Sequence, residues 1–132
     1  LPGWVKRRQE IAQKYDAALA EIPAIRPLRV RGDVSPAYHL YVVRLDLKRL
    51  RATRAEVFKA LRAEGIGVNV HYIPVHMHPF YQKTFGTGPG LCPVAEGAYE
   101  EIITLPLFPR MSDSDVEDVI TAVCKVMEAY QK

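Results

Sequence analysis

Histidine and tyrosine side chains crowd one short stretch of the sequence, VNVHYIPVHMHPFY at residues 68–81. A run of imidazoles and phenols makes a poor core, because each buried ring nitrogen or hydroxyl needs a hydrogen-bond partner. The same side chains suit the wall of a pocket for a polar ligand, since aromatic faces can stack while N–H and O–H groups bond to ligand oxygens. We therefore interpret the histidines and tyrosines of this stretch as the wall of a candidate ligand pocket: His71, Tyr72, His76, His78 and Tyr81.

A metal site is one alternative for this stretch. Its ligands would be the imidazoles of His71, His76 and His78, with His39 in reserve. Three histidines could hold a catalytic zinc ion and leave one position open. Two features oppose this alternative: Pro74 and Pro79 bend the chain on both sides, and no acidic residue lies nearby in the sequence to orient a ring. We therefore expect no metal.

Other chemistry finds less support in the sequence. No serine lies in a GxSxG elbow and neither cysteine is next to a histidine, so no activated nucleophile is expected. The glycines of GTGPG, at residues 86–90, do not follow a strand and open a long helix as phosphate-binding loops do, and they indicate a plain turn. One further alternative stays open, in which the rings are ordinary, partly buried side chains at the end of a strand.

The composition is that of one ordinary globular domain. The chain has 132 residues, of which 48% are hydrophobic and 25% charged, and its formal net charge is +3. The densest basic run, RPLRVRGD at residues 26–33, has no interleaved aromatic residues, so we expect no nucleic-acid partner. No apolar run approaches the ~18 to 20 residues of a membrane span, and we expect a cytoplasmic protein without membrane contact. Cys92 and Cys124 are too few for a disulfide framework and are expected to be reduced.

Helix and strand signals alternate along the chain. Helices are predicted up to residue 22 and over residues 53–65 and 112–130, and strands over residues 38–45, 66–70 and 101–107. Residues 23–36 are predicted to be a connector. Residues 77–100 are predicted to be a loop that includes a short helix, which Pro93 could begin. Two helix starts, Thr53 with Glu56 and Ser112 with Asp115, have the spacing of a capping box. Together the elements predict an α+β fold, with a small mixed or antiparallel three-stranded sheet and helices packed on one of its faces.

The predicted strand at 66–70 orients the first candidate residue. Its period of two places Ile66, Val68 and Val70 on one face, and Gly67, Asn69 and His71 on the other. Because the aliphatic face must meet the helices, the polar pair is expected to point away from the core and to bond only to water.

Two longer stretches resemble a known family. GIGVNVHYIPVHMHPFYQ, followed by CPVAEGAYEEIITLPLFPRMSDSDVEDVI, resembles the C-terminal domain of the DegT-type nucleotide-sugar aminotransferases, which are pyridoxal-phosphate enzymes of fold type I. RRQEIAQKYDAAL resembles the helix that leads from their large domain into the small one. The branch that makes 4-amino sugars for nonulosonic acids looks closest. The most specific parts are HYxPxH, here His71, Tyr72, Pro74 and His76, and the LPLFP turn at residues 105–109.

The resemblance implies a division of the chain and a function for a longer parent enzyme. Residues 1–22 would be a linking helix from a missing large domain, and residues 23–132 the small C-terminal domain. The sequence opens at Leu1 without a methionine and runs at once into a helical pattern, as if cut from a longer chain. The parent, a homodimer, would transfer an amino group from glutamate to the keto group of a nucleotide-linked sugar, in amino-sugar and polysaccharide biosynthesis. The expected substrate-binding residues are His71 and Tyr72, followed by a second tier of His76, His78 and Tyr81, which would contact the substrate or close the pocket.

The resemblance also implies what this chain lacks. Such enzymes hold pyridoxal phosphate as a Schiff base on a lysine of the large domain, within an SxHxxK-like segment. No such segment occurs here, and Lys83 in YQKTFG comes nearest to it. We therefore expect the cofactor only in the full-length enzyme, and no cofactor, no catalytic residue and no activity in this chain, which we expect to self-associate. A stand-alone α+β regulatory module that binds a small molecule stays open as a different class.

Overall fold

The computed structural model describes all of residues 1–132, and its centre is an open antiparallel sheet. The strands β1 (Ile25–Pro27), β2 (Tyr41–Leu45) and β3 (Ile102–Leu105) lie in the order β1-β2-β3. Ile25 is opposite Leu45 and Tyr41 is opposite Leu105 in the two registers. Tyr41, Val43 and Leu45 are buried and Arg44 is exposed, so one face of the sheet meets the core and the other does not.

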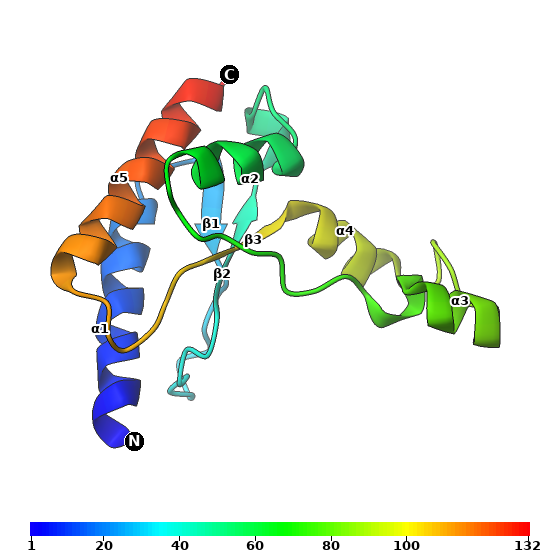
Figure 1. The fold of residues 1–132 in the computed structure, drawn as a ribbon, viewed down its shortest axis with the longest axis horizontal. Coiled ribbons are helices and arrows are strands. Elements are labelled where there is room, and N and C mark those ends of the chain that lie inside the picture. The colour runs from blue at the N-terminus through cyan, green and yellow to red at the C-terminus, as the bar shows by residue number, and fades with distance from the viewer.

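Three long helices form the core with the sheet. They are α1 (Pro2–Leu19), α2 (Arg54–Ala63) and α5 (Asp113–Tyr130), and α1 and α2 each pack against α5 (Figure 1). A cluster of 24 buried apolar residues joins these helices to the strands. Tyr15 of α1 is fully buried in it, and its hydroxyl donates to the carbonyl of Pro106 at 2.8 Å. The predicted fold class, an α+β layer with a three-stranded sheet, is confirmed.

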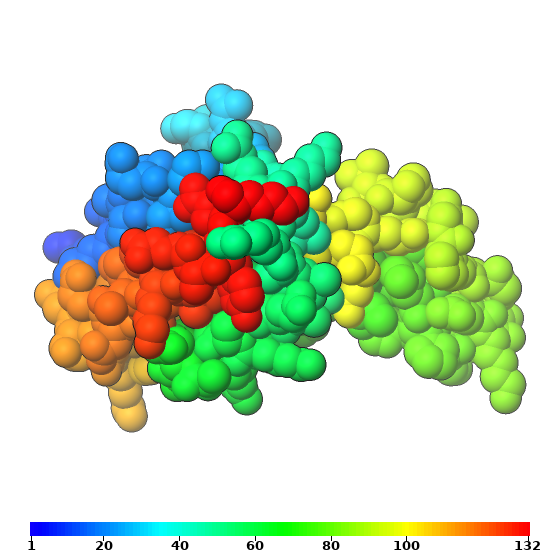
Figure 2. Space-filling view, turned by 90° about the horizontal axis from the view of Figure 1, so that it is seen from above, coloured from blue at the N-terminus to red at the C-terminus, as the bar shows by residue number.

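A projecting arm, residues 74–101, makes up the remainder of the chain. It contains a short 3₁₀ helix (Val75–Met77), α3 (Pro79–Phe85) and α4 (Pro93–Glu101). Figure 1 shows α3 lying far from the sheet, and Figure 2 shows the same segment standing apart from the rest of the molecular surface. A second 3₁₀ turn, Leu47–Arg49, follows β2. No helix of the protein combines the length and apolar character that crossing a membrane requires.

Both predicted capping boxes are present. The hydroxyl of Thr53 accepts from the backbone N–H of Glu56 at 3.3 Å, and the Glu56 carboxylate accepts from the backbone N–H of Thr53 at 2.7 Å. Ser112 and Asp115 make the same reciprocal pair at the start of α5. Hydrogen bonds to the charged form lower the pKa of both carboxyl groups, mainly from the Thr53 backbone to Glu56 and from the Ser112 hydroxyl to Asp115.

The prediction of a β-strand over residues 66–70 is wrong. This segment forms a single bridge, in which Asn69 and Thr104 exchange backbone hydrogen bonds of 3.1 and 2.8 Å. Its side chains still alternate as predicted, since Ile66 and Val68 are buried and Asn69 is exposed. The third strand of the sheet comes instead from the predicted connector, where Ile25–Pro27 forms β1. As an edge strand, β1 tolerates the missing N–H of its proline.

Two other boundaries differ from the sequence prediction. The strand expected from residue 38 begins at Tyr41, because Tyr38 has a φ of 47°, which interrupts the extended backbone. The expected loop after residue 77 contains α3 in addition to the predicted α4. Helix α3 begins at Pro79 and ends at Phe85, and Gly86 follows it with a φ of 65°, which suits a glycine after a helix end.

Candidate functional site

The imidazole of His71 is held against β3 on the sheet face opposite the core. Its Nδ1 lies 3.0 Å from the hydroxyl of Thr104, a side chain only 5% exposed, and its Nε2 lies 3.3 Å from the amide nitrogen of Asn69. Thr104 is opposite Val42 of β2, and both alternate with residues that enter the core. The prediction that His71 points away from the core is therefore confirmed, but the prediction that it bonds only to water is wrong.

These contacts indicate which nitrogen of the neutral His71 ring carries the hydrogen. The side-chain oxygen of Asn69 already accepts from the backbone N–H of Val70 at 2.8 Å, so the amide NH₂ is the group that faces the ring. Nε2 therefore accepts from Asn69, and Nδ1–H donates to the hydroxyl of Thr104. The longer bond, to an exposed amide, is the one that an incoming hydroxyl could replace without breaking the contact with β3.

Tyr72 lies beside His71 and is largely open to solvent. The two rings meet edge to face, with centroids 4.5 Å apart, and the peptide bond between them is cis. Tyr72 is 68% exposed, and its hydroxyl has no partner within the chain. His71 and Tyr72 thus form a small polar and aromatic surface, which we call the His71 edge and define by His71, Tyr72, Asn69 and Thr104.

His76 has a different setting, inside the arm. Its Nε2 lies 2.8 Å from a carboxylate oxygen of Glu96, and its carbonyl accepts from the hydroxyl of Thr87 at 2.8 Å. Glu96 also accepts from the backbone N–H groups of Gly90, at 2.8 and 2.9 Å, and Cys92, at 3.1 Å. The backbone N–H of Gly90, followed by His76, lowers the pKa of Glu96. His76 and Glu96 therefore tie the 86–92 loop to the start of α4, and we call this contact the Glu96 clasp.

The remaining two candidates lie on the outer part of the arm. His78 is exposed and precedes α3 without making a side-chain cap. Tyr81 packs its ring against Phe80 and Phe85, with centroids 5.4 and 6.0 Å apart. The structure therefore brings together His71 and Tyr72, sets His76 in the clasp, and leaves His78 and Tyr81 at a separate aromatic surface.

Two partners of the candidate histidines were not identified from the sequence. Glu96 is 20 residues from His76, and Thr104 is 33 residues from His71. No local spacing signals either pair, because each depends on how β3 and α4 return to the 69–76 segment. The first residues of α4 gave the one available signal, an acid four residues after Cys92 at a predicted helix start.

Lysine is the residue type that holds pyridoxal phosphate as a Schiff base, and this chain has seven lysines. None of the seven is buried, and Lys83 is exposed on α3. Lys14 pairs with Asp113 at 3.0 Å, and Lys125 pairs with Glu64 at 2.8 Å. A Schiff-base lysine needs a desolvated pocket or a neighbouring cation to favour its neutral amine, and none of the seven lies in a desolvated pocket. No group of three or more His, Cys, Asp or Glu side chains is placed to hold a metal ion.

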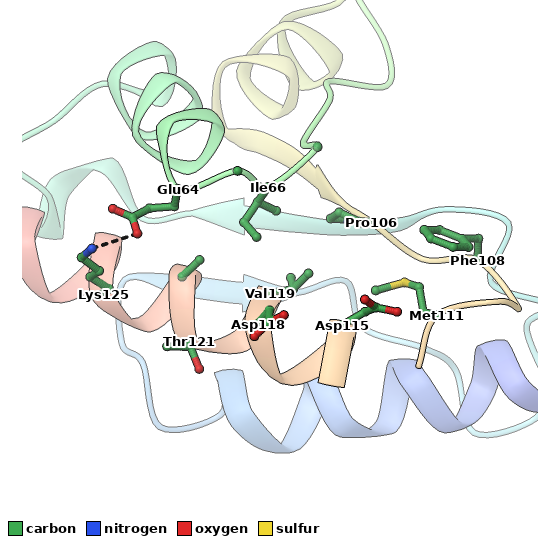
Figure 3. A pocket seen from close by; sticks show the side chains of 13 residues that line it. Glu64, Ile66, Pro106, Phe108, Met111, Asp115, Asp118, Val119, Thr121 and Lys125 are labelled. Carbon is green, nitrogen blue, oxygen red and sulfur yellow. Dashed lines mark hydrogen bonds and ion pairs between the residues drawn. The ribbon is translucent and has the colours of Figure 1, made fainter. Parts of the chain in front are cut away.

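The largest cavity, of about 570 Å³, lies elsewhere (Figure 3). It opens between the 64–67 turn, the 106–111 segment and residues 115–125 of α5. Ile66, Phe108 and Met111 give it an apolar wall, and the Glu64–Lys125 ion pair closes one end. None of the five candidate residues lines it, and Asp115 at its rim is already bound to Ser112.

Comparison with known proteins agrees with the resemblance seen in the HYxPxH and LPLFP motifs. Residues 1–124 match the DegT/DnrJ/EryC1/StrS aminotransferase family. The spore coat polysaccharide biosynthesis protein SpsC of Bacillus subtilis (strain 168) is 46% identical over 124 residues, which are 93% of this chain and 32% of that protein.

Solved structures of similar proteins share the fold. The aminotransferase TlmJ from Streptoalloteichus hindustanus has a TM-score of 0.84 and 35% identity, over 98% of this chain and 33% of its own. Helicobacter pylori PseC, an aminotransferase involved in the biosynthesis of pseudoaminic acid, has a TM-score of 0.87 and 27% identity, over 97% of this chain and 34% of its own. This chain thus spans about a third of the length of these relatives. It belongs to the DegT/DnrJ/EryC1/StrS aminotransferase family.

Proposed function

We propose that this chain is the small C-terminal domain of a pyridoxal-phosphate-dependent aminotransferase that acts on a keto sugar nucleotide. Glutamate would supply the amino group, and the product would enter amino-sugar or polysaccharide biosynthesis. The family match and the names of SpsC and PseC support this proposal. The 4-amino-sugar branch is also part of the proposal, and it rests on the resemblance of the sequence. The parent enzyme would be a cytoplasmic homodimer that binds a nucleotide-sugar and an amino acid, and neither nucleic acid nor membrane.

The division of the chain is part of this proposal. Residues 1–22 would connect to a large domain, and residues 23–132 would form the small domain. In the structure, Ile11 and Tyr15 of α1 are buried in the same core as the sheet, so the helix would be joined firmly to the small domain.

The observation that best supports the proposal is the His71 edge. It presents an imidazole in a fixed orientation, a replaceable amide and an open phenol ring on the sheet face that the core leaves free. A sugar offers hydroxyl groups for the polar atoms and apolar C–H faces for the ring, which is the combination that such a surface can bind. We propose that His71 and Tyr72 contact the sugar, and that His78, Tyr81 and the clasped His76 serve substrate contact or closure of the pocket from the arm.

The cofactor would be held by the part of the parent that this chain does not include. No residue of this chain is proposed as the Schiff-base lysine or as the proton-transfer base. We therefore expect the 132-residue chain to show no transamination. Incubation with pyridoxal phosphate, borohydride reduction and peptide mapping should find no lysine labelled in stoichiometric amount. A single labelled lysine, such as Lys83, would contradict this part of the proposal.

The function itself is tested on the full-length protein that contains this chain. Purified protein, a nucleotide-linked 4-keto sugar and glutamate should give 2-oxoglutarate and the amino sugar in equal amounts. The variant His71→Ala should lower turnover or sugar affinity while leaving the cofactor absorbance unchanged. Conversion of glutamate to 2-oxoglutarate at a rate that does not depend on the sugar would count against a sugar substrate. Tight binding of a free amino acid by the 132-residue chain alone would instead favour the regulatory-module alternative.

A further inference from the structure

A second basin lies beside the edge strand β1 and is distinct from the His71 edge. It has a volume of about 450 Å³, and none of the five candidate residues lines it. Its charged lining consists of Arg26, Arg29, Arg44, Lys48, Asp46 and Glu101. The first four side chains are cationic and the last two are anionic, so the basin carries an excess of two positive charges.

The sheet register places two of these guanidinium groups together. Arg26 of β1 is directly opposite Arg44 of β2, so the two side chains leave the same face of the sheet. Like charges at such a position repel one another, and each is held by a carboxylate. Arg26 donates to Asp46 at 2.9 Å, and the Nε of Arg44 donates to Glu101 at 3.0 Å.

These ion pairs orient the arginines without using all of their donors. A guanidinium has five N–H groups in a fixed plane, and each carboxylate takes one or two of them. The charge of Asp46 is further shared with the side chain of Arg49, at 3.3 Å, and with the backbone N–H of Lys48, at 3.3 Å. The guanidinium of Arg29 and the ammonium of Lys48 have no carboxylate partner.

We propose that this basin binds a diphosphate group. A diphosphate has two phosphorus centres with oxygens on all sides, and it can contact several separated cations at once, as a single carboxylate or a monophosphate cannot. Planar guanidinium groups bind such oxygens through paired N–H donors. The excess positive charge attracts a multivalent anion, and the volume leaves room for an attached group. The inference is independent of the proposed sugar aminotransferase function.

Calorimetric titration of the 132-residue chain tests the site directly. Inorganic pyrophosphate should bind saturably at one site per chain at low ionic strength, and more weakly as salt is added. Inorganic phosphate should bind at least about tenfold more weakly, because it reaches fewer cations. A nucleoside diphosphate, ADP, separates two sources of the same group. Binding equal to that of pyrophosphate means that the diphosphate alone is recognised, and tighter binding means that a nucleotide is the ligand.

Three matched arginine variants complete the test. Arg29→Gln should weaken pyrophosphate binding about tenfold, and it disturbs no carboxylate because Arg29 has none as a partner. Arg44→Gln should weaken it at least as much. Arg62→Gln, on α2 and outside the basin, removes the same charge and should leave the affinity within about twofold. The proposal is overturned if pyrophosphate shows no saturable binding, if phosphate binds as tightly, or if the Arg62 variant loses as much affinity as the basin variants.

Discussion

The body of the molecule and its arm are stabilised in different ways. All 24 apolar residues of the core lie outside residues 74–101, and the one buried residue of the arm is the polar His76. Burial of apolar surface is the dominant favourable contribution to folding, so the body contributes most of the free energy that stabilises the fold. The arm depends instead on α3, α4 and the hydrogen bonds of the Glu96 clasp. Such segments are commonly the first to open locally.

The arm also exposes large apolar side chains to solvent, whereas the body buries most of its own. Phe80 and Phe85 are each 65% exposed, and Val94 is 86% exposed. The rings of Phe80 and Phe85 also pack together, with centroids 6.5 Å apart, and exposed apolar clusters are typical of segments that another protein surface covers. In the proposed parent enzyme the large domain or the second subunit would cover these side chains. In the isolated chain it is the physical reason to expect self-association, which stays a prediction.

The largest expected difference between body and arm concerns the removal of apolar side chains. Ile103→Ala should lower the free energy of unfolding by about 2 to 5 kcal/mol, because Ile103 is fully buried and its removal leaves a cavity. Phe85→Ala in the arm removes a larger side chain, yet should change it by less than about 0.5 kcal/mol. Urea unfolding of the two variants measures both values. A loss in the Phe85 variant as large as that in the Ile103 variant would show that the arm belongs to the same cooperative unit as the core.

The second prediction concerns His71, where the body meets the base of the arm. His71→Ala should lower the free energy of unfolding by about 1 kcal/mol, because the buried hydroxyl of Thr104 loses its partner. Thr104→Val removes that hydroxyl and nearly preserves the shape. In a double-mutant cycle, His71→Ala should therefore cost less when Thr104 is already valine. Strictly additive costs would mean that the 3.0 Å contact contributes nothing to stability.

The sequence predicted the body better than the arm, for a physical reason. Helices α2 and α5 have capping boxes and apolar side chains at helical spacing, and these signals are local. The alternation of Ile66 and Val68 with Asn69 is also local, and it survives although the segment is not a strand. The short strand β1 has no comparable signal, because three residues that include a proline are too few to show a period.

The candidate site was predicted only in part, because its partners come from distant segments. The five side chains were chosen for their chemistry, and only His71 and Tyr72 form one surface. Their density suggested one pocket wall, but the chain bends at the 3₁₀ helix and places His76 against Glu96 instead. A single sequence carries no signal for a contact between residues 20 positions apart on different elements. The roles of the five residues in binding stay predictions.

The third prediction tests the Glu96 clasp as a local device. Glu96→Gln removes the charge that accepts from two backbone N–H groups and His76, so the 86–92 loop should open more often. Amide hydrogen exchange at Gly90 and Cys92 should become faster, while exchange at Val43 in β2 stays the same. Glu100→Gln, an exposed acid on the same helix without a partner, is the matched control. Faster exchange in β2 as well would show that the clasp supports the body.

The smallest effect is expected from acid, which acts on the clasp through one carboxyl group. The pKa of Glu96 is lowered, mainly by the backbone N–H of Gly90 and then by His76. A carboxyl whose pKa is lower in the folded state contributes stability that is complete above its unfolded pKa, about 4.3, and lost as the pH falls through the folded pKa. The clasp should therefore stay closed at neutral pH and loosen only when the pH falls below the ordinary pKa of glutamate.

The amide chemical shifts of Gly90 and Cys92, followed from pH 7 downward, measure this transition in the arm. Its midpoint should lie below the ordinary glutamate value, and it should be absent in Glu96→Gln. In the body, acid also protonates Glu56 and Asp115, whose pKa values are lowered by their capping boxes. Those helices remain packed against a core whose residues do not titrate in acid. The chemical shifts of the arm should therefore change while those of β2 stay the same. A midpoint at or above the ordinary value, or a simultaneous shift in β2, would mean that the arm does not depend on Glu96 in the way its hydrogen bonds indicate.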